Sequence, residues 1–172
     1  MSTTKISWII VGVLAVVLGV ALFLNKDIVS QNKTTFENVE LNIISDGEQI
    51  GTLSYDDMIA LGAVEFEAVY DTSNTDAIIQ MYKGVEIKTI IESFGISLED
   101  KEAVVLTAVD NYAMAYTVEE VLEDGNVYAT FECEGEALLD KDNDGDGPIM
   151  AIVTSDQFSN RRCKWMISIE VK

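Results

Sequence analysis

An uninterrupted apolar segment near the N-terminus limits what this chain can fold into. Residues 6–24, ISWIIVGVLAVVLGVALFL, contain no charged side chain. As a helix this segment would be roughly 28 Å long, which is close to the hydrocarbon thickness of a bilayer. A cleaved signal peptide, with residues 19–21 as the cleavage site, is the alternative, but its apolar region is usually shorter. We therefore expect a retained transmembrane signal anchor.

This anchor divides the chain into four parts. Residues 1–5 form a short tail, residues 6–24 the anchor, residues 25–36 a polar and aperiodic linker, and residues 37–172 a single folded domain. A short tail before the first apolar helix favours export of the chain beyond that helix. We expect a single-pass membrane protein whose C-terminal domain is extracytoplasmic and which contacts the membrane through the anchor.

The expected exported domain is strongly acidic. Without residues 1–26 the chain keeps 9 basic and 30 acidic side chains, a formal charge of −21. This charge repels nucleic acid and anionic lipid, so we expect neither as a partner. Histidine is absent from the whole sequence. Its absence excludes Ser-His-Asp and Cys-His catalysis, and every zinc or iron site that uses histidine.

The chain contains two cysteines, Cys133 and Cys163. Two are too few for a four-cysteine metal cluster or a disulfide framework. A single disulfide between them and two separate buried thiols are both compatible with the sequence.

Short strands alternate with short helices along the domain. Residues 39–43 alternate apolar and polar side chains, which is typical of a strand, whereas residues 87–94 repeat apolar side chains at helical spacing. Ser54 is a suitable N-cap for one helix, and Thr117 with Glu120 forms a capping box for another. We expect about eight strands and three short helices, an α+β domain with strand-rich mixed sheets.

Two turns are predicted inside this pattern. Residues 82–84, Tyr-Lys-Gly, are interpreted as a turn between a strand and the helix at residues 87–94. Asp110 is interpreted as the turn between two strands that pair as a hairpin.

The segment DKDNDGDGPIM raises the question of a calcium site. Asp140, Asp142 and Asp144, followed directly by a glycine, match positions 1, 3, 5 and 6 of an EF-hand loop. Position 12, which should be a bidentate glutamate, is Ala151, and the flanking residues are typical of strands. We therefore interpret the segment as an acidic turn between strands. A weak calcium site on the three aspartates is the alternative.

A small basic cluster lies near the C-terminus, in the segment SNRRCKWM. Arg161, Arg162 and Lys164 are three of the nine cations that follow residue 26. In a strand or its approach loop, positions 162 and 164 share a face, where they would bind a phosphate or another anion. The alternative is that these cations neutralise nearby carboxylates or cover Trp165 by stacking.

From residue 54 onward, the order of motifs resembles the molybdopterin-binding domain of the sulfite oxidase family, in particular its small stand-alone bacterial versions. The motifs are Tyr82 with Gly84, Asp110 with Tyr112, Gly135 with Leu138, Gly147 with Pro148, and Lys164 with Trp165. The resemblance implies a sulfite-oxidase-type fold and a molybdopterin cofactor whose metal is ligated by a cysteine thiolate. The candidate cofactor-binding residues are Arg161, Arg162, Lys164, Asp110 and Tyr112.

The chain departs from the family where the metal ligand should lie. The corresponding stretch, residues 64–75, contains no cysteine, and Cys133 and Cys163 lie where the family does not place the ligand. Oxygen donors such as Tyr70 or Asp71 replace a thiolate poorly. We therefore expect a molybdopterin-binding-domain-like module without catalytic residues or a cofactor, which binds a protein partner or an anionic small molecule. A molybdopterin-dependent oxidoreductase with non-cysteine ligation and a calcium-dependent surface-binding protein are the alternatives.

Overall fold

The computed structural model describes residues 39–72, 75–138 and 145–172. They all belong to one unit of the chain, Asn38–Lys172. The expected tail, anchor and linker lie outside the described residues. Within the described ranges, no helix is long and apolar enough to cross a membrane.

Strands dominate the described part of the chain, as the sequence predicts. The strands are β1 (Glu40–Ser45), β2 (Glu48–Ser54), β3 (Val64–Thr72), β4 (Thr75–Glu86), β5 (Ala103–Ala108), β6 (Ala113–Thr117), β7 (Val127–Cys133), β8 (Glu136–Ala137), β9 (Met150–Val153) and β10 (Met166–Val171). The helices are α2 (Tyr55–Ala60), α3 (Ile87–Ser93), α4 (Val118–Leu122) and the 3₁₀ helix η2 (Ser159–Arg161). Strand β8 is too short to produce a periodic pattern, so the sequence predicts too few strands.

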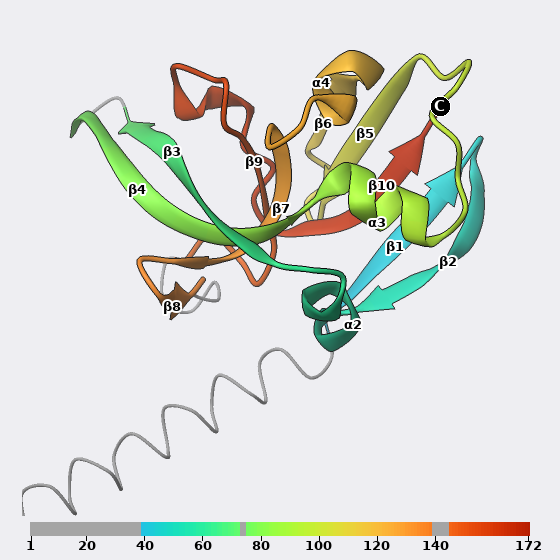
Figure 1. Cartoon of the computed structure of the whole chain (residues 1–172), viewed down its shortest axis with the longest axis horizontal. Coiled ribbons are helices and arrows are strands. Elements are labelled where there is room, and N and C mark those ends of the chain that lie inside the picture. The colour runs from blue at the N-terminus through green and yellow to red at the C-terminus, as the bar shows by residue number, and fades with distance from the viewer. Residues whose placement is uncertain (1–38, 73–74, 139–144) are drawn as a thin grey trace, which may run out of the picture. The chain divides into compact units, whose positions relative to one another are not determined.

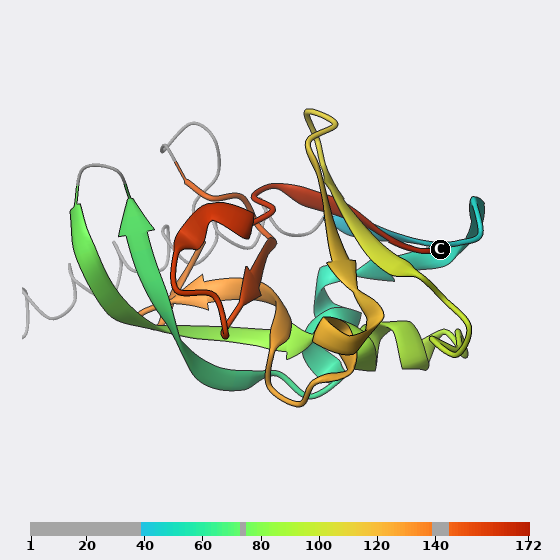
Figure 2. The ribbon, with the colours of Figure 1, turned by 90° about the horizontal axis from the view of Figure 1, so that it is seen from above.

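These strands form two sheets (Figure 1). The first has the order β2-β1-β10-β5-β6, in which only β1 and β10 run parallel. The second has the order β3-β4-β7-β8, and β9 also pairs with β7. Figure 2 shows β3 and β4 extending together away from β7, and we call this pair the β3–β4 ribbon. The mixed, strand-rich α+β architecture is therefore confirmed.

The main hydrophobic core connects the two sheets. Leu41 and Ile43, which alternate along β1, are fully buried in it. Helix α3 adds Ile87, Ile90 and Ile91 on the face that the helical spacing predicts. The core therefore forms from the period-two and period-3.6 patterns that the sequence shows.

A second, smaller apolar cluster covers the opposite face of the second sheet. In β9, Ala151 and Val153 belong to the main core, whereas Met150 and Ile152 belong to this second cluster with Tyr82. Successive strand side chains point to opposite faces, so a strand that is buried throughout must be covered on both sides.

Side-chain caps begin two of the helices, as expected. The Ser54 hydroxyl accepts a hydrogen bond from the Asp57 N–H at 3.2 Å at the start of α2. At the start of α4, Thr117 and Glu120 each bond the other's backbone N–H in a capping box. These bonds satisfy N–H groups that the first helical turn leaves without a helical partner.

The predicted turn at residues 82–84 is wrong, because these residues lie inside β4. The pairing of β4 with β7 shifts by one residue between Lys83 and Gly84, which is a β-bulge. A Cβ atom at Gly84 would lie 2.5 Å from the carbonyl oxygen of Ala129 on β7. The glycine therefore permits close approach of two strands and does not mark a turn.

We expect Gly84→Ala to lower the free energy of unfolding by about 2–4 kcal/mol, because the methyl group would separate β4 from β7 at the bulge. Gly51→Ala in β2 is the matched control. There the new Cβ would meet the ring of Phe94 at 2.8 Å, and a side chain can move aside. Urea unfolding followed by tryptophan fluorescence measures both variants, and equal losses would contradict this account of Gly84.

Candidate functional site

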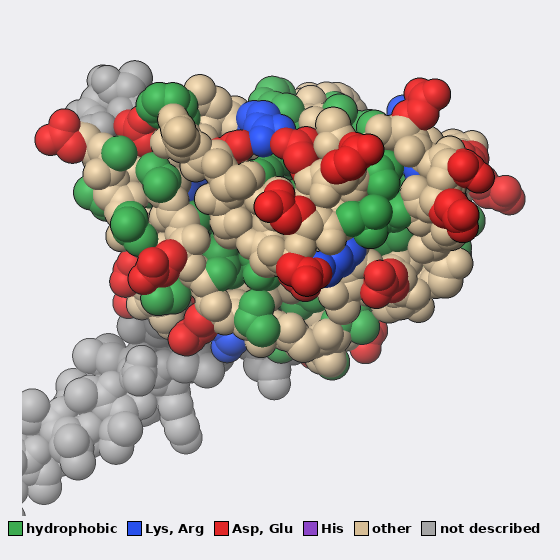
Figure 3. Space-filling model, turned by 45° about the horizontal axis from the view of Figure 1, so that its top comes forward, with side chains coloured by type: hydrophobic (Ala, Val, Ile, Leu, Met, Phe, Trp, Pro, Cys, Tyr) green, Lys and Arg blue, Asp and Glu red, His purple; other side chains and the backbone are tan. Residues whose placement is uncertain are grey.

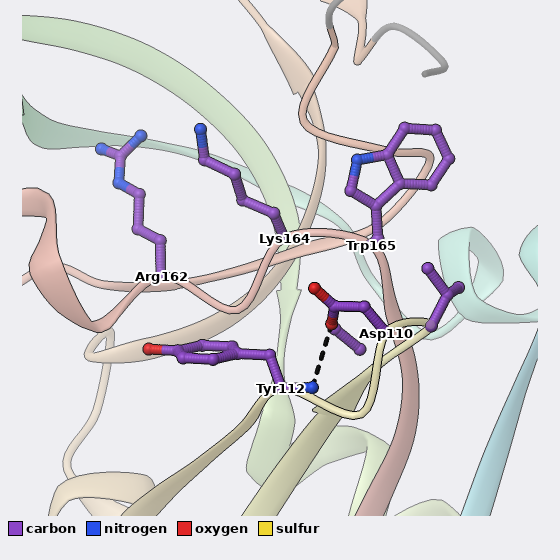
Figure 4. Close-up of a pocket in the computed structure, with 7 residues that line it drawn as sticks. Asp110, Tyr112, Arg162, Lys164 and Trp165 are labelled. Atoms are coloured by element: carbon purple, nitrogen blue, oxygen red, sulfur yellow. Dashed lines mark hydrogen bonds between the residues drawn. The ribbon is translucent and has the colours of Figure 1, made fainter.

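A pocket of about 360 Å³ lies between the β5–β6 turn and the segment that leads into β10. We call it the hairpin pocket. Its lining residues are Ala108, Val109, Asp110, Tyr112, Arg162, Lys164 and Trp165. In Figure 4, the side chains of Arg162, Lys164 and Trp165 leave their segment on the same side, and Tyr112 extends beside it from the turn. The pocket brings together four of the candidate cofactor-binding residues: Asp110, Tyr112, Arg162 and Lys164.

Local hydrogen bonds shape the β5–β6 turn. The Asp110 carboxylate accepts a hydrogen bond from the Tyr112 N–H at 2.9 Å. Asn111 adopts a left-handed φ of 65°, and its N–H donates to the Ala108 carbonyl at 3.0 Å. Asp110 is therefore a turn aspartate, as predicted, and its side chain also lines the pocket. Tyr112 is 45% exposed, so its ring is accessible at the pocket wall.

Trp165 occupies a strained backbone conformation at the other wall. Its φ of 58° lies in the left-handed region, which bulky residues rarely adopt. The indole Nε1 donates to the Gly145 carbonyl at 3.2 Å, and the backbone N–H donates to the Asp146 carbonyl at 3.1 Å. A Cβ at Gly147 would lie 2.8 Å from the indole, so only glycine leaves room for the ring. The Gly-Pro motif therefore helps to position Trp165.

Arg162 is a buried cation with neutral partners. It is 8% exposed, and its guanidinium donates to the Tyr82 hydroxyl at 2.8 Å and to the Val69 carbonyl at 2.7 Å. The same group lies over the rings of Tyr70 and Tyr82, 5.4 and 5.0 Å from their centroids. Every other Lys or Arg side chain in the described ranges forms a salt bridge with a carboxylate. Among the described residues, Arg162 has no such partner.

The environment of Arg162 also affects Tyr82. Burial raises the pKa of the Tyr82 hydroxyl to about 12, although the hydrogen bond from Arg162 acts in the opposite direction. The hydroxyl is therefore neutral at physiological pH and leaves the guanidinium charge uncompensated.

Lys164 lies at the exposed side of the hairpin pocket. Its ammonium forms a salt bridge of 2.5 Å with Asp146, and its side chain is 50% exposed. A salt bridge this exposed contributes little to stability, because water solvates both groups. The Lys164 ammonium can therefore exchange the Asp146 carboxylate for another anion at little cost in free energy.

Arg161 does not line the hairpin pocket. Its guanidinium pairs with Asp156 and, at 2.7 Å, with Glu120. The hydrogen bond to Asp156, above all, raises the pKa of Arg161. The Arg161 carbonyl accepts a hydrogen bond from the Tyr116 hydroxyl. Arg161 therefore links α4 and β6 to the chain before β10, and the structure separates it from the other candidate residues.

Neither cysteine is suited to hold a metal as a thiolate. Both are free thiols, so the disulfide alternative does not describe this structure. Cys163 is fully buried in the main core, donates to the Leu106 carbonyl at 3.6 Å, and has a pKa that burial raises to about 11. Cys133 is half-buried, and desolvation raises its pKa above the ordinary value. Burial therefore disfavours the thiolate form of both side chains in the metal-free protein.

The oxygen donors Tyr70 and Asp71, which the sequence offers in place of a thiolate, lie in β3. The Tyr70 ring lies against Arg162, and the Asp71 N–H bonds Ser159. Within the described part of the chain, no group of three or more His, Cys, Asp or Glu side chains is arranged to hold a metal ion. These donors do not fit a thiolate-ligated molybdenum centre.

The three aspartates of the predicted calcium site, Asp140, Asp142 and Asp144, lie outside the described residues. The acidic turn and the weak calcium site therefore both stay predictions.

Sequence reasoning missed several groups around the cations. Arg162 bonds Tyr82 and Val69, which lie 80 and 93 positions earlier in the sequence, and it also lies over the ring of Tyr70. No local sequence pattern connects residues so far apart. Asp146, the partner of Lys164, is adjacent to the Gly-Pro motif, but it is far from Lys164 in the sequence, so no local pattern predicts this ion pair. The order of motifs was the only signal that placed these segments in one fold.

Comparisons with known proteins support the fold at a coarse level. No family model and no curated protein matches the chain. Among solved structures, its fold is similar to that of the sulfane dehydrogenase SoxCD from Paracoccus pantotrophus, with a TM-score of 0.64 and 15% sequence identity. The similarity covers 78% of this chain and 38% of that chain. At this identity the similarity shows a shared fold alone.

The Arg161 network predicts a dependence of stability on pH through Glu120. Burial raises the pKa of Glu120, but hydrogen bonds from the Thr117 N–H and from Arg161 outweigh burial and lower the pKa below its ordinary value. Such a carboxylate stabilises the fold above its unfolded pKa, and this stability is lost as pH falls through the folded pKa. We expect Glu120→Gln to cost about 1–2 kcal/mol at neutral pH and progressively less below about pH 4.

Unfolding of both proteins in urea between pH 3 and pH 7 measures this difference. Glu119→Gln is the matched control, because Glu119 lies in the same helical turn and is exposed. We expect it to cost about 0.5 kcal/mol or less. A Glu120→Gln loss that does not change with pH would contradict the assigned ion pair.

Proposed function

We propose that this chain is a membrane-anchored, extracytoplasmic module with the sulfite-oxidase-type molybdopterin-binding fold that binds a small anion in the hairpin pocket. In this proposal it acts by binding and carries out no molybdenum chemistry. The ordered sequence motifs and the fold similarity to a sulfane dehydrogenase support the fold. The unsuitable thiols and the cations of the pocket support the binding role.

The single observation that carries the anion-binding role is the buried charge of Arg162. A buried charge without an opposite charge costs several kcal/mol, which hydrogen bonds to neutral groups and aromatic faces offset only in part. The guanidinium has five N–H donors, and its two hydrogen bonds to Tyr82 and Val69 use only some of them. An anion next to Arg162 would supply both the missing charge and further acceptors.

Lys164 would assist by exchanging Asp146 for the ligand. This exchange costs little, because the existing salt bridge is half-exposed. The formal charge of −21 that we expect for the exported domain opposes the approach of any anion from a distance. We therefore expect weak binding, with a Kd of about 1 mM for a simple anion such as phosphate.

A molybdopterin-dependent oxidoreductase with non-cysteine ligation is the second candidate. One observation favours it, the fold similarity to a dehydrogenase. It would need a metal held without a thiolate, for which the described residues provide no cluster.

We expect phosphate at about ten times its Kd to stabilise the purified full-length chain by about 1.4 kcal/mol, which raises Tm by about 3–6 °C relative to sodium chloride of equal ionic strength. Arg162→Gln and Lys164→Gln should each remove most of this increase. Differential scanning calorimetry measures the change.

Two controls separate site binding from general effects. Lys172→Gln removes another half-exposed lysine that pairs with a carboxylate, so it should leave the phosphate effect unchanged. Arg161→Gln should lower Tm but preserve the increase with phosphate. Equal increases in all variants would contradict a site at Arg162 and Lys164.

Metal analysis distinguishes the two candidate functions. We expect far less than one molybdenum atom per chain in full-length protein purified from a bacterial host with molybdenum and intact cofactor synthesis. A sulfite oxidase family protein from the same host is the loading control. Inductively coupled plasma mass spectrometry measures the content, and stoichiometric molybdenum would establish the oxidoreductase candidate instead.

A further inference from the structure

The β3–β4 ribbon carries many of the exposed apolar side chains. Val64, Ile78, Ile79 and Met81 are exposed by 46, 51, 68 and 38%. They are four of the nine large apolar side chains that are exposed in the described part of the chain. A concentration of exposed apolar side chains on one element is typical of an interaction surface.

One end of the β3 edge is already covered. Strand β3 pairs with β4 alone among the described strands. The Ser159 hydroxyl donates to the Val69 carbonyl at 3.2 Å and accepts a hydrogen bond from the Asp71 N–H at 2.7 Å. Arg162 donates to the same carbonyl. The η2 segment therefore occupies the edge as a short added strand would.

No described segment pairs with the other end of the edge. In an antiparallel pair, the backbone groups of alternate residues point to the same side of the strand. Because the edge groups of Val69 and Asp71 point outward, those of Glu65 and Glu67 point outward as well. Within the described ranges, no backbone group outside β4 bonds Glu65 or Glu67. Unpaired edge groups of this kind accept a further strand.

A groove of about 180 Å³ lies beside this edge. Its lining residues are Glu67, Ala68, Val69, Ile79 and Thr154. Val69 and Ile79 are directly paired across β3 and β4, and thus share a face. The groove therefore has an apolar side and an acidic side, next to the open backbone groups.

The charge of the ribbon favours a basic occupant. Its one lysine, Lys83, pairs with Glu132 at 3.5 Å. Its acidic residues are Glu65, Glu67, Asp71, Asp76 and Glu86. At the left of Figure 3, acidic and hydrophobic side chains lie next to each other over this ribbon. A second copy of the chain would bring the same acidic ribbon and be repelled, so complementarity favours a different, cationic partner.

We propose that the β3 edge at residues 65–67 binds an extended, basic segment of another protein as an added strand. An apolar side chain of that segment fills the groove that Val69 and Ile79 line, and flanking Lys or Arg side chains pair with Glu65 and Glu67. This surface is independent of anion binding in the hairpin pocket, so either proposal can fail alone.

The test uses the full-length chain in a non-ionic detergent and a fluorescent peptide, Lys-Val-Lys-Val-Lys-Val-Lys, followed by fluorescence anisotropy. The comparison peptide has the same sequence but is N-methylated at two adjacent central residues. Methylation keeps the charge and removes a backbone donor from each edge of the peptide, so we expect it to weaken binding about tenfold or more. Equal binding of the two peptides, or no binding of either, would overturn the proposal.

Variants of the chain test the position of the peptide. Ile79→Ser, and Glu65→Gln with Glu67→Gln, should each weaken binding about fivefold or more. Ile50→Ser, at a residue 47% exposed on β2, and Glu99→Gln with Glu102→Gln are the matched controls, which should change binding less than about twofold. Equal effects of the ribbon and control variants would overturn the proposal, as would self-association of the chain that Ile79→Ser abolishes in sedimentation velocity.

Discussion

The guanidinium of one arginine connects the hairpin pocket with the β3–β4 ribbon. Arg162 bonds the Val69 carbonyl on the β3 edge, lies over the rings of Tyr70 and Tyr82, and lines the hairpin pocket. Its charge is buried but meets neutral groups among the described residues. This arrangement fixes the segment before β10 against the second sheet, and it also leaves a positive potential next to a pocket. Stability and the proposed binding therefore depend on the same side chain.

The two adjacent arginines show that position in the fold, and not residue type, decides their roles. Arg161 is neutralised by Asp156 and Glu120 and ties α4 to the C-terminal part of the chain. Arg162 instead bonds Tyr82 and Val69, and no carboxylate among the described residues pairs with it. If the fold is of the sulfite oxidase type, as we propose, then this chain combines a cationic pocket with a β3 strand that lacks the thiolate. That combination is compatible with binding and is poorly suited to molybdenum ligation.

Much of the fold can be predicted from local sequence patterns. Strand alternation predicts the burial of Leu41 and Ile43, and helical spacing predicts that of Ile87, Ile90 and Ile91. The helix caps at Ser54 and Thr117 also form as their side chains predict. The error at residues 82–84 has a non-local cause, since Gly84 is needed for the approach of Ala129 from a strand more than 40 positions later. For the hairpin pocket, the sequence predicts the candidate binding residues Asp110, Tyr112, Arg162 and Lys164, but not that they enclose one cavity. The partners of Arg162, the strain at Trp165 and the open edge at Glu65 and Glu67 result from tertiary contacts that no local pattern encodes.

Arg162 is one of only two arginines in the chain, so a direct measurement on its side chain is feasible. Arginine-selective ¹⁵N labelling of the full-length protein would give two side-chain Nε signals in NMR spectra, assigned with Arg161→Lys. On addition of phosphate at constant ionic strength, we predict that the Arg162 signal shifts and saturates while the Arg161 signal stays in place. Signals that both remain unchanged, or that shift together without saturation, would contradict an anion site at the buried guanidinium.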